Sequence, residues 1–299
     1  DGLRENLLAL SRARTIPQKL QAIARIRPQD LAPVAPSTAE ARTGLSMGEH
    51  QARTTAHWGI TRQAQDELAL ASHTNMAAAW DRGFFDDLVT PYLGVTRDTN
   101  LRADSTMESL AKLNPVFGRN LETEATMTAG NSTPLTDGAS TVLLGSEEFA
   151  AELGIEPLAY LVDAEAAAVD FVEGEEGLLM APAYAVPRLL ARNGLTFNDI
   201  DVFEIHEAFA STVLCHLAAW ESEEFCTQKL GLDAPLGAVD RAKLNPNGSS
   251  LAAGHPFAAT GGRIVAQTAK HLKETGQKRA LISICAAGGQ GVAAIVEAD

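Results

Sequence analysis

The sequence predicts an α/β protein with layers of helices and strands, and three observations support this fold class. Two apolar runs near the C-terminus, residues 280–284 and 292–296, have the length and composition of buried strands. Helical and strand patterns alternate from about residue 146 onward, which is typical of layered α/β folds. The chain has 299 residues, of which 45% are hydrophobic, so it can bury a sizeable core.

Two short amphipathic helices are expected at the N-terminus. Apolar residues recur at helical spacing on both sides of Pro17, and residues 1–30 contain six Lys/Arg against three acidic residues. This positive excess opposes the overall charge. The basic faces indicate either a solvated surface over a small core, or a peripheral contact with a membrane or a neighbouring subunit.

The middle of the chain predicts one long helical region and then alternating elements. The helical region follows the stretch Gly44-Leu-Ser-Met-Gly48 and runs through Trp80. Strands are expected at residues 138–145 and 157–162, on either side of a helix at 146–153. A further helix is expected from Tyr184 to Arg192, since Asn193 and a glycine follow it.

Overall charge and cysteine usage limit the classes of function. The formal net charge of −14 disfavours nucleic acid as a partner, because such binding needs clustered Lys and Arg. Three cysteines are too few for a disulfide scaffold, so a reducing cytoplasm is expected. No run of 18 apolar residues occurs, so no membrane span is expected. The first residue is Asp1 rather than Met, which favours a truncated chain.

His255 is the first candidate for a reactive group. It lies between a small-residue loop (Gly248, Ser249, Ser250, Gly254) and a helix that Pro256 is expected to begin and that runs toward Leu272. The N–H groups at a helix start favour an oxyanion and lower the pKa of a nearby imidazole. His255 is therefore either a neutral base or simply a histidine packed at a helix start.

Two other stretches decide between these interpretations. His206, in Glu204-Ile-His-Glu-Ala-Phe-Ala, follows a short apolar run that predicts a strand, so it lies at a strand-to-helix turn. Cys285 ends the strand at 280–284 and begins Cys-Ala-Ala-Gly-Gly-Gln-Gly. A zinc site built from these three residues is disfavoured, because their wide spacing lacks the short ligand pairs of structural zinc sites, and no metal is expected.

The three stretches, in this order and at these separations, resemble the C-terminal half of the thiolase family. Histidine at 206, where many thiolases carry asparagine, further resembles the β-subunits of trifunctional β-oxidation enzymes. The resemblance implies a layered αβαβα thiolase fold made of two similar halves. It assigns residues 1–132 to a helical loop domain that binds CoA, 133–160 to the end of the N-terminal half, and 161–299 to the complete C-terminal domain.

The resemblance also implies a reaction. Thiolases cleave 3-ketoacyl-CoA with CoA to acetyl-CoA and a shortened acyl-CoA, here in fatty-acid β-oxidation. Cys285 would exchange the α-carbon proton, with a thiol poised near neutral pKa. His255 would activate the nucleophilic cysteine and donate to the thioester oxygen, and His206 would complete that oxyanion site through a water. Ala287, where the family usually has glycine, would supply a second oxyanion N–H if its dihedral angles permit. Glu207 is expected to orient a main-chain or histidine donor.

The family's CoA-binding positions can be transferred in the same way. CoA enters as a substrate, and no cofactor is expected. From the residues alone, alternatives remain for three positions: Met47 as a core methionine, Arg102 in a surface ion pair, and Phe209 as a core phenylalanine. The complete set of CoA-binding positions is Met47, Arg102, Ser109, Ala129, Thr133 and Phe209.

One requirement of the family is not met in this sequence. The nucleophilic cysteine normally lies in a Cys-x-Ser stretch upstream of the loop domain, and no such stretch occurs. Cys215 is expected to be a buried apolar residue, and Cys226 lies in an acidic segment. The chain alone is therefore expected to lack turnover. Alternatives are a biosynthetic acetyl-CoA C-acetyltransferase and a non-catalytic CoA binder. Family partners would be a second copy, as a homodimer or dimer of dimers, and a hydratase/dehydrogenase α-subunit.

Overall fold

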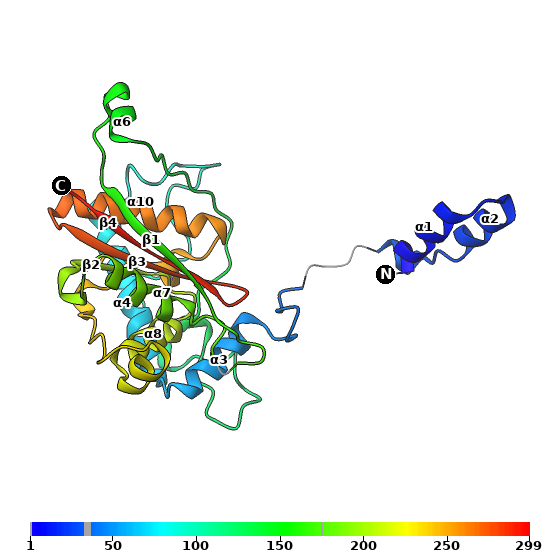
Figure 1. Ribbon diagram of the computed structural model, residues 1–299, viewed down its shortest axis with the longest axis horizontal. Helices are drawn as coiled ribbons and strands as arrows, with labels where there is room; N and C mark the ends of the chain where they lie inside the picture. Colours follow the sequence, from blue (N-terminus) through cyan, green and yellow to red (C-terminus); the bar gives the residue numbers. More distant parts are fainter. Residues whose placement is uncertain (1, 33–36, 175) are drawn as a thin grey trace. The chain divides into compact units, whose positions relative to one another are not determined.

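The computed structural model describes residues 2–32, 37–174 and 176–299. Its internal contacts divide the chain into two compact units, Asp1–Thr38 and Ala39–Asp299 (Figure 1). This division does not test the predicted domain boundaries at residues 132 and 160, which remain predictions.

The first unit contains the two predicted N-terminal helices. They are α1 (Gly2–Arg12) and α2 (Ile16–Ala24), followed by a short 3-10 helix at Pro28–Leu31. Thr15 caps α2 and forms a reciprocal capping box with Gln18, while Pro17 lies in the first turn of α2 and does not separate the helices. The apolar side chains Leu7, Leu8, Ile16, Leu20 and Ile23 are exposed.

The second unit is built on a four-stranded mixed sheet. Its strands are β1 (Tyr160–Ala168), β2 (Val202–Ile205), β3 (Arg279–Ala286) and β4 (Gln290–Glu297), in the order β1-β4-β3-β2. Strands β2 and β3 are parallel, whereas β4 is antiparallel to both β3 and β1. The two predicted C-terminal strands are confirmed.

Helices cover both faces of this sheet, as Figure 1 shows. Helix α10 (Ala258–Thr275) packs through Ile264 and Leu272 against one face. Helices α7 (Ala181–Arg192) and α8 (Ala210–Glu221) cover the other face with a larger apolar core. Successive strand residues alternate between the two cores, since Val202 joins the first and Phe203 the second. The predicted layered α/β architecture is confirmed.

The remaining helices pack beside this sandwich or lie in its connections. The predicted helical region before Trp80 consists of two helices, α3 (Met47–His57) and α4 (Arg62–Asp81), with Thr61 as the N-cap of α4. The others are shorter: α5 (Met107–Ala111), α6 (Glu147–Leu153) and α9 (Ser250–Ala253), with single turns at Ala129–Asn131, Phe197–Asp199, Phe225–Lys229 and Arg241–Lys243.

Two local predictions are wrong. Residues 138–145 form no strand, because the segment runs beside α10, where Ser140 Oγ donates to the Ala259 carbonyl (2.7 Å), and no strand among the described residues pairs with it. Helix α10 begins at Ala258 instead of Pro256, since Phe257 has a φ of 40°, outside the helical region. None of the helices that the structure describes is long and apolar enough to cross a membrane.

Candidate active site

Parallel pairing of β2 and β3 brings two of the predicted residues to one edge of the sheet. His206 directly follows β2, and its N–H donates to the Ser283 carbonyl of β3 at 2.9 Å. Cys285 lies two residues further along β3. Because the carboxyl ends of parallel strands meet at the same edge, His206 and Cys285 lie on the same side of the fold.

Asn245 attaches the loop that carries His255 to the outer edge of β2. Its N–H donates to the Phe203 carbonyl (2.9 Å), and its side chain bonds both the N–H and the carbonyl of Ile205 (2.8 and 3.0 Å). The amide of Asn245 thus replaces a neighbouring strand at this point. Its φ of 46° turns the chain back toward α9.

The two candidate histidines lie against each other. The ring centroids of His206 and His255 are 4.4 Å apart, with 44° between the planes. Each ring bonds a hydroxyl through Nδ1 at 2.7 Å, His206 to Ser250 Oγ and His255 to Thr260 Oγ1. The structure therefore brings together two residues that are 49 positions apart in the sequence.

Burial differs between the two rings. His206 is 1% exposed, and this burial, followed by the charges of His255 and Arg263, holds its pKa well below the ordinary value. His255 is half-buried, and its pKa is lowered by burial and then by Arg263. Both imidazoles are thus neutral near pH 7, and the role of His255 as a base stays a prediction.

Cys285 lies in an apolar cluster beside this pair. It packs with Phe171, Ala208 and Phe209, and it is 6% exposed. Burial raises the pKa of the thiol to about 12. The prediction of a thiol near neutral pKa is therefore wrong for this structure, since the apolar surroundings disfavour the thiolate. At neutral pH the group is a proton donor.

Glu207 holds the loop main chain behind the two rings. Its carboxylate accepts hydrogen bonds from Ser72 Oγ (2.7 Å), Asn245 Nδ2 (2.7 Å) and the N–H of Leu251 (3.1 Å). This confirms that the side chain orients a main-chain donor. Its pKa is raised by burial, and the three hydrogen bonds oppose that shift.

The glycines around His255 allow close approach of protein to protein. Gly248 and Gly254 have φ values of 71° and 93°. A Cβ at Gly248 would collide with the Ser72 carbonyl of α4, and one at Gly254 would collide with Thr136. The loop contains many small residues because it packs closely against α4 and the 132–136 segment.

Three of the six predicted CoA-binding residues lie near the thiol or the histidine loop. Met47, at the start of α3, packs against the cluster that contains Cys285 and Phe209. Thr133 Oγ1 donates to the carbonyl of Ser250 at 2.6 Å.

The other three predicted positions have different surroundings. Arg102 Nη1 donates to the Thr99 carbonyl (3.0 Å), and Ser109 forms a capping box with Thr106 at α5. Ala129 is exposed in its 3-10 turn. None of the three makes a hydrogen bond to His206, His255 or Cys285 within the described residues.

Ala287 is unstrained in its turn, and its role as an oxyanion donor stays a prediction. It lies exposed in the turn between β3 and β4, before Gly288 and Gly289, which have φ values of 80° and 75°. Positive φ among the described non-glycine residues occurs at Leu93, Asn245 and Phe257, so the two glycines provide the left-handed turn and alanine is unstrained.

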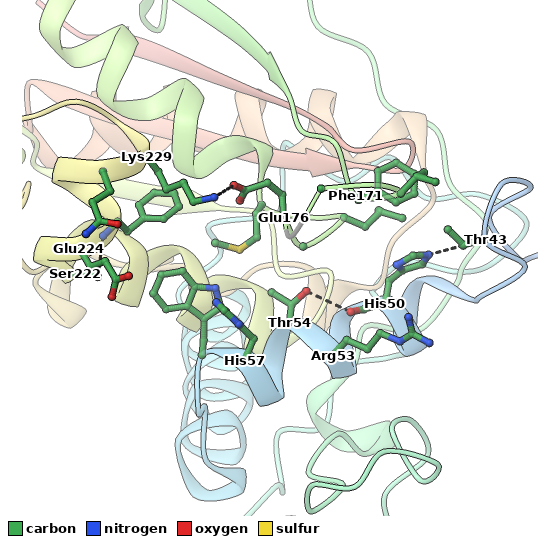
Figure 2. A pocket seen from close by; sticks show the side chains of 18 residues that line it. Thr43, His50, Arg53, Thr54, His57, Phe171, Glu176, Ser222, Glu224 and Lys229 are labelled. Atoms are coloured by element: carbon green, nitrogen blue, oxygen red, sulfur yellow. Dashed lines mark hydrogen bonds and ion pairs between the residues drawn. The ribbon is translucent and has the colours of Figure 1, made fainter.

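A cavity of about 690 Å³ lies beside α3 (Figure 2). His50, Arg53 and Thr54 of α3 line one side, and the Glu176–Lys229 ion pair lies across from them. Its lining includes none of the three predicted catalytic residues, but Phe171 belongs both to this lining and to the cluster of Cys285. Phe171 thus links the cavity wall to the apolar cluster of Cys285.

The sequence interpretation missed four residues that hold the site. Asn245, Ser250, Thr260 and Arg263 all occur in the stretch that contains His255, but no hydrogen bond can be inferred from spacing alone. Within the described ranges, no cluster of three His, Cys, Asp or Glu side chains could hold a metal ion.

Comparison with known proteins places the whole chain in one family. The model of the thiolase N-terminal domain matches residues 14–148, and that of the thiolase C-terminal domain matches residues 155–298. The chain belongs to the thiolase family. The histidine pair and Cys285 therefore lie in the part that matches the C-terminal thiolase domain.

Similar thiolases have been described in bacteria and in humans. A 3-ketoacyl-CoA thiolase of Yersinia enterocolitica is 44% identical over 304 residues, covering 100% of this chain and 68% of that protein. The one of Pectobacterium carotovorum is 44% identical over 302 residues, with coverage of 99% and 68%. The chain thus spans about two thirds of the length of these relatives.

Two solved structures show the same fold. The Bacillus anthracis acetyl-CoA acetyltransferase aligns with a TM-score of 0.72 and 34% identity, over 87% of this chain and 62% of that one. Human mitochondrial 3-ketoacyl-CoA thiolase aligns with a TM-score of 0.71 and 27% identity, over 91% and 67%. The thiolase fold predicted from the sequence is confirmed.

Proposed function

We propose that this chain provides the acid–base part of a 3-ketoacyl-CoA thiolase, which cleaves 3-ketoacyl-CoA with CoA to acetyl-CoA and a shortened acyl-CoA. The pair of neutral imidazoles at 4.4 Å carries the proposal. A thioester carbonyl that accumulates negative charge needs preorganised donors, and a thiol nucleophile needs a base. The names of the bacterial relatives support the same reaction.

Each residue of the site has a proposed role that follows from its burial and its hydrogen bonds. His255, half-buried and neutral, acts as the base toward the nucleophile and then as a donor to the thioester oxygen. His206 acts as the fixed neutral donor of that oxyanion site. Cys285, with its thiol protonated, returns a proton to the α-carbon of the enolate. The N–H of Ala287 serves the second oxyanion.

CoA is proposed to act as a substrate rather than as a resident cofactor. Met47 and Phe209 would border its pantetheine arm, since both pack in the cluster of Cys285. Ala129 and Thr133 would contact the same arm. Arg102 and Ser109 would hold the nucleotide end, because a guanidinium suits phosphate and a hydroxyl can accept or donate.

We place the protein in fatty-acid β-oxidation, as a β-subunit of the trifunctional type, with histidine at 206 as the supporting residue. None of the three cysteines is suited to be the nucleophile, since Cys215, Cys226 and Cys285 are all buried. A separate cysteine is therefore part of the proposal. The free thiols favour a reducing cytoplasm.

Two surfaces support the proposed partners. β1 is one of the two edge strands of the described sheet and exposes Leu161 and Val162, so it suits a homodimer contact. The exposed apolar residues of α1 and α2, on helices with basic residues, suit a membrane surface or a hydratase/dehydrogenase α-subunit.

The decisive assay uses the complete protein encoded by the gene that contains this sequence. Incubation with free CoA and acetoacetyl-CoA, or longer 3-ketoacyl-CoA, is expected to release acetyl-CoA. The control is the same protein with His255→Ala. Absence of cleavage for every chain length, in a folded wild-type protein, would refute the proposed function.

The similarity to an acetyl-CoA acetyltransferase structure favours the biosynthetic direction as a second candidate. Comparison of the two directions under the same conditions separates it from degradation. A non-catalytic CoA binder is separated by intact mass after incubation with acetyl-CoA: a turnover-competent protein gains an acetyl group on cysteine, and a binder does not.

A further inference from the structure

The hydrogen bond between Ser250 and His206 belongs to a longer chain of polar groups. Arg263, on α10, donates from Nη2 to Ser250 Oγ at 3.0 Å and from Nη1 to Gln267 Oε1 at 3.1 Å. Gln267 Nε2 in turn donates to Glu204 Oε1 at 2.8 Å. The guanidinium is thus fixed on one side by Gln267 and points on the other side at the hydroxyl that touches His206.

The hydrogen-bond donors around Ser250 determine which ring nitrogen of His206 carries the hydrogen. A guanidinium has five N–H donors and no acceptor, so Ser250 Oγ must accept from Arg263. The single hydroxyl hydrogen is then available for His206 Nδ1, which is 2.7 Å away. If Nδ1 carried a hydrogen instead, the hydroxyl hydrogen would have no acceptor among the described residues. Leaving a buried donor unpaired is unfavourable, so this alternative is disfavoured.

We infer that Arg263, acting through Ser250, holds His206 as the neutral tautomer with its hydrogen on Nε2, so that the ring serves as a permanent hydrogen-bond donor. Ser250 and Arg263 are positioning residues in this inference, which rests on the proposed function only for the identity of the acceptor, a thioester oxygen. No described residue hydrogen-bonds Nε2, so that nitrogen remains for a ligand.

The surroundings of the ring also disfavour a second proton. His255 and Arg263 both lie close enough to oppose positive charge on His206, and the ring is 1% exposed. His255 differs, because no described donor fixes the hydrogen of Thr260 Oγ1. Its hydroxyl partner can therefore rotate when the ring gains or loses a proton, as a base requires.

The tautomer can be read directly by NMR on the chain labelled with ¹⁵N-histidine. Long-range proton–nitrogen correlations distinguish protonated from unprotonated ring nitrogens, and His206→Gln assigns the signal by its loss. We expect Nε2 of His206 to be protonated and Nδ1 unprotonated. A hydrogen on Nδ1, or a doubly protonated ring at pH 7, would overturn the inference.

Two serine variants then isolate the positioning effect. Ser250→Ala removes the hydroxyl on His206 and should convert the single tautomer into a mixture. Ser249→Ala is the matched control, since Ser249 also accepts from Arg263 (3.4 Å) but makes no hydrogen bond to His206. His216, whose Nε2 bonds the Leu179 carbonyl at 2.8 Å, reports in the same spectra that the fold is intact. Unchanged His206 signals in Ser250→Ala would contradict the inference.

Activity supplies an independent readout. In the complete protein, Ser250→Ala is expected to lower kcat about tenfold with little change in KM, since the donor is misdirected for part of the time. If the complete wild-type protein has no thiolase activity but shows the Nε2–H tautomer, the proposed function fails and the inference stands. If the tautomer is wrong, the inference fails whatever the activity.

Discussion

His206 and His255 have the same kind of hydrogen-bond partner, but they differ in burial and in whether that partner is fixed by a further group. Both bond a hydroxyl through Nδ1 at 2.7 Å, and both have a lowered pKa. His206 is fully buried, and its hydroxyl partner is fixed by Arg263, whereas His255 is half-buried on a loop before α10. A hydroxyl beside an imidazole therefore does not define the role of that ring. The groups beyond the hydroxyl decide whether the ring can exchange a proton.

The largest expected effect comes from removing His255, the ring that gains and loses a proton. In the complete protein, His255→Ala should reduce kcat by roughly 10²–10⁴-fold, the usual contribution of a general base. The free energy of unfolding should also fall by about 1 kcal/mol, because Thr260 Oγ1 loses its hydrogen-bond partner. Steady-state kinetics and thermal unfolding measure the two effects. His57→Gln, an exposed histidine on α3, is the control. A loss below about tenfold would remove His255 from the proposed role of base.

The sequence identified these rings because their chemistry is tied to short, recognisable stretches. His206 lies at a strand-to-helix turn, and Cys285 lies near the end of a buried strand, so parallel pairing of β2 and β3 places both at one edge. The layered fold was predictable for the same reason. An apolar run such as residues 280–284 indicates a buried strand, whichever strand it pairs with in the sheet.

Other features depended on contacts between distant segments and could not be predicted. The sequence indicates that Ser250 is a small residue that gives space, yet its hydroxyl bonds a histidine 44 positions away. The segment at 138–145 has a strand-like pattern, but none of the described strands pairs with it. The resemblance implies a pKa near neutral for the Cys285 thiol, whereas its burial in the cluster with Phe171 and Phe209 raises that pKa.

Cys285 is a third titratable group at the site, and burial holds its thiol in the protonated form. With a pKa of about 12 against an ordinary value near 8.5, its thiolate fraction at pH 8 falls on the order of a thousandfold. Alkylation by iodoacetamide, followed by peptide mass spectrometry, should be slower than in the denatured chain by at least that factor. Cys285→Ser confirms the assignment. Rapid modification of the folded chain would show that the thiol is poised near neutral pKa after all.

Acidification should distinguish the buried ring through stability. The folded pKa of His206 lies well below its unfolded value near 6.5, so below pH 6.5 the unfolded state binds a proton that the folded state excludes. The free energy of unfolding should therefore fall with decreasing pH, by about 1.4 kcal/mol per pH unit from this residue. Above pH 6.5 the residue should contribute no slope.

The measurement must separate His206 from the acids nearby. Burial raises the folded pKa values of Glu204 and Glu207, which contribute a slope of opposite sign above their unfolded values. Urea titrations between pH 5 and 8 should therefore compare wild type with His206→Gln. The variant should lose the His206 slope, and His57→Gln should keep it. Equal slopes in wild type and His206→Gln would contradict a neutral buried ring.

The smallest expected effect comes from the hydroxyl beside His255, and α10 supplies a matched pair of buried threonines. Thr260 Oγ1 bonds His255 Nδ1, whereas Thr268 Oγ1 has no hydrogen-bond partner among the described residues. Thr260→Val should destabilise the protein by about 1 kcal/mol, the usual net worth of a hydrogen bond, and lower kcat several-fold by freeing the ring. Thr268→Val should be neutral or stabilising, because it removes an unpaired buried hydroxyl. Urea unfolding and kinetics of both variants provide the test. Equal losses in the two variants would mean that the effect comes from packing along α10, and that Thr260 does not orient His255.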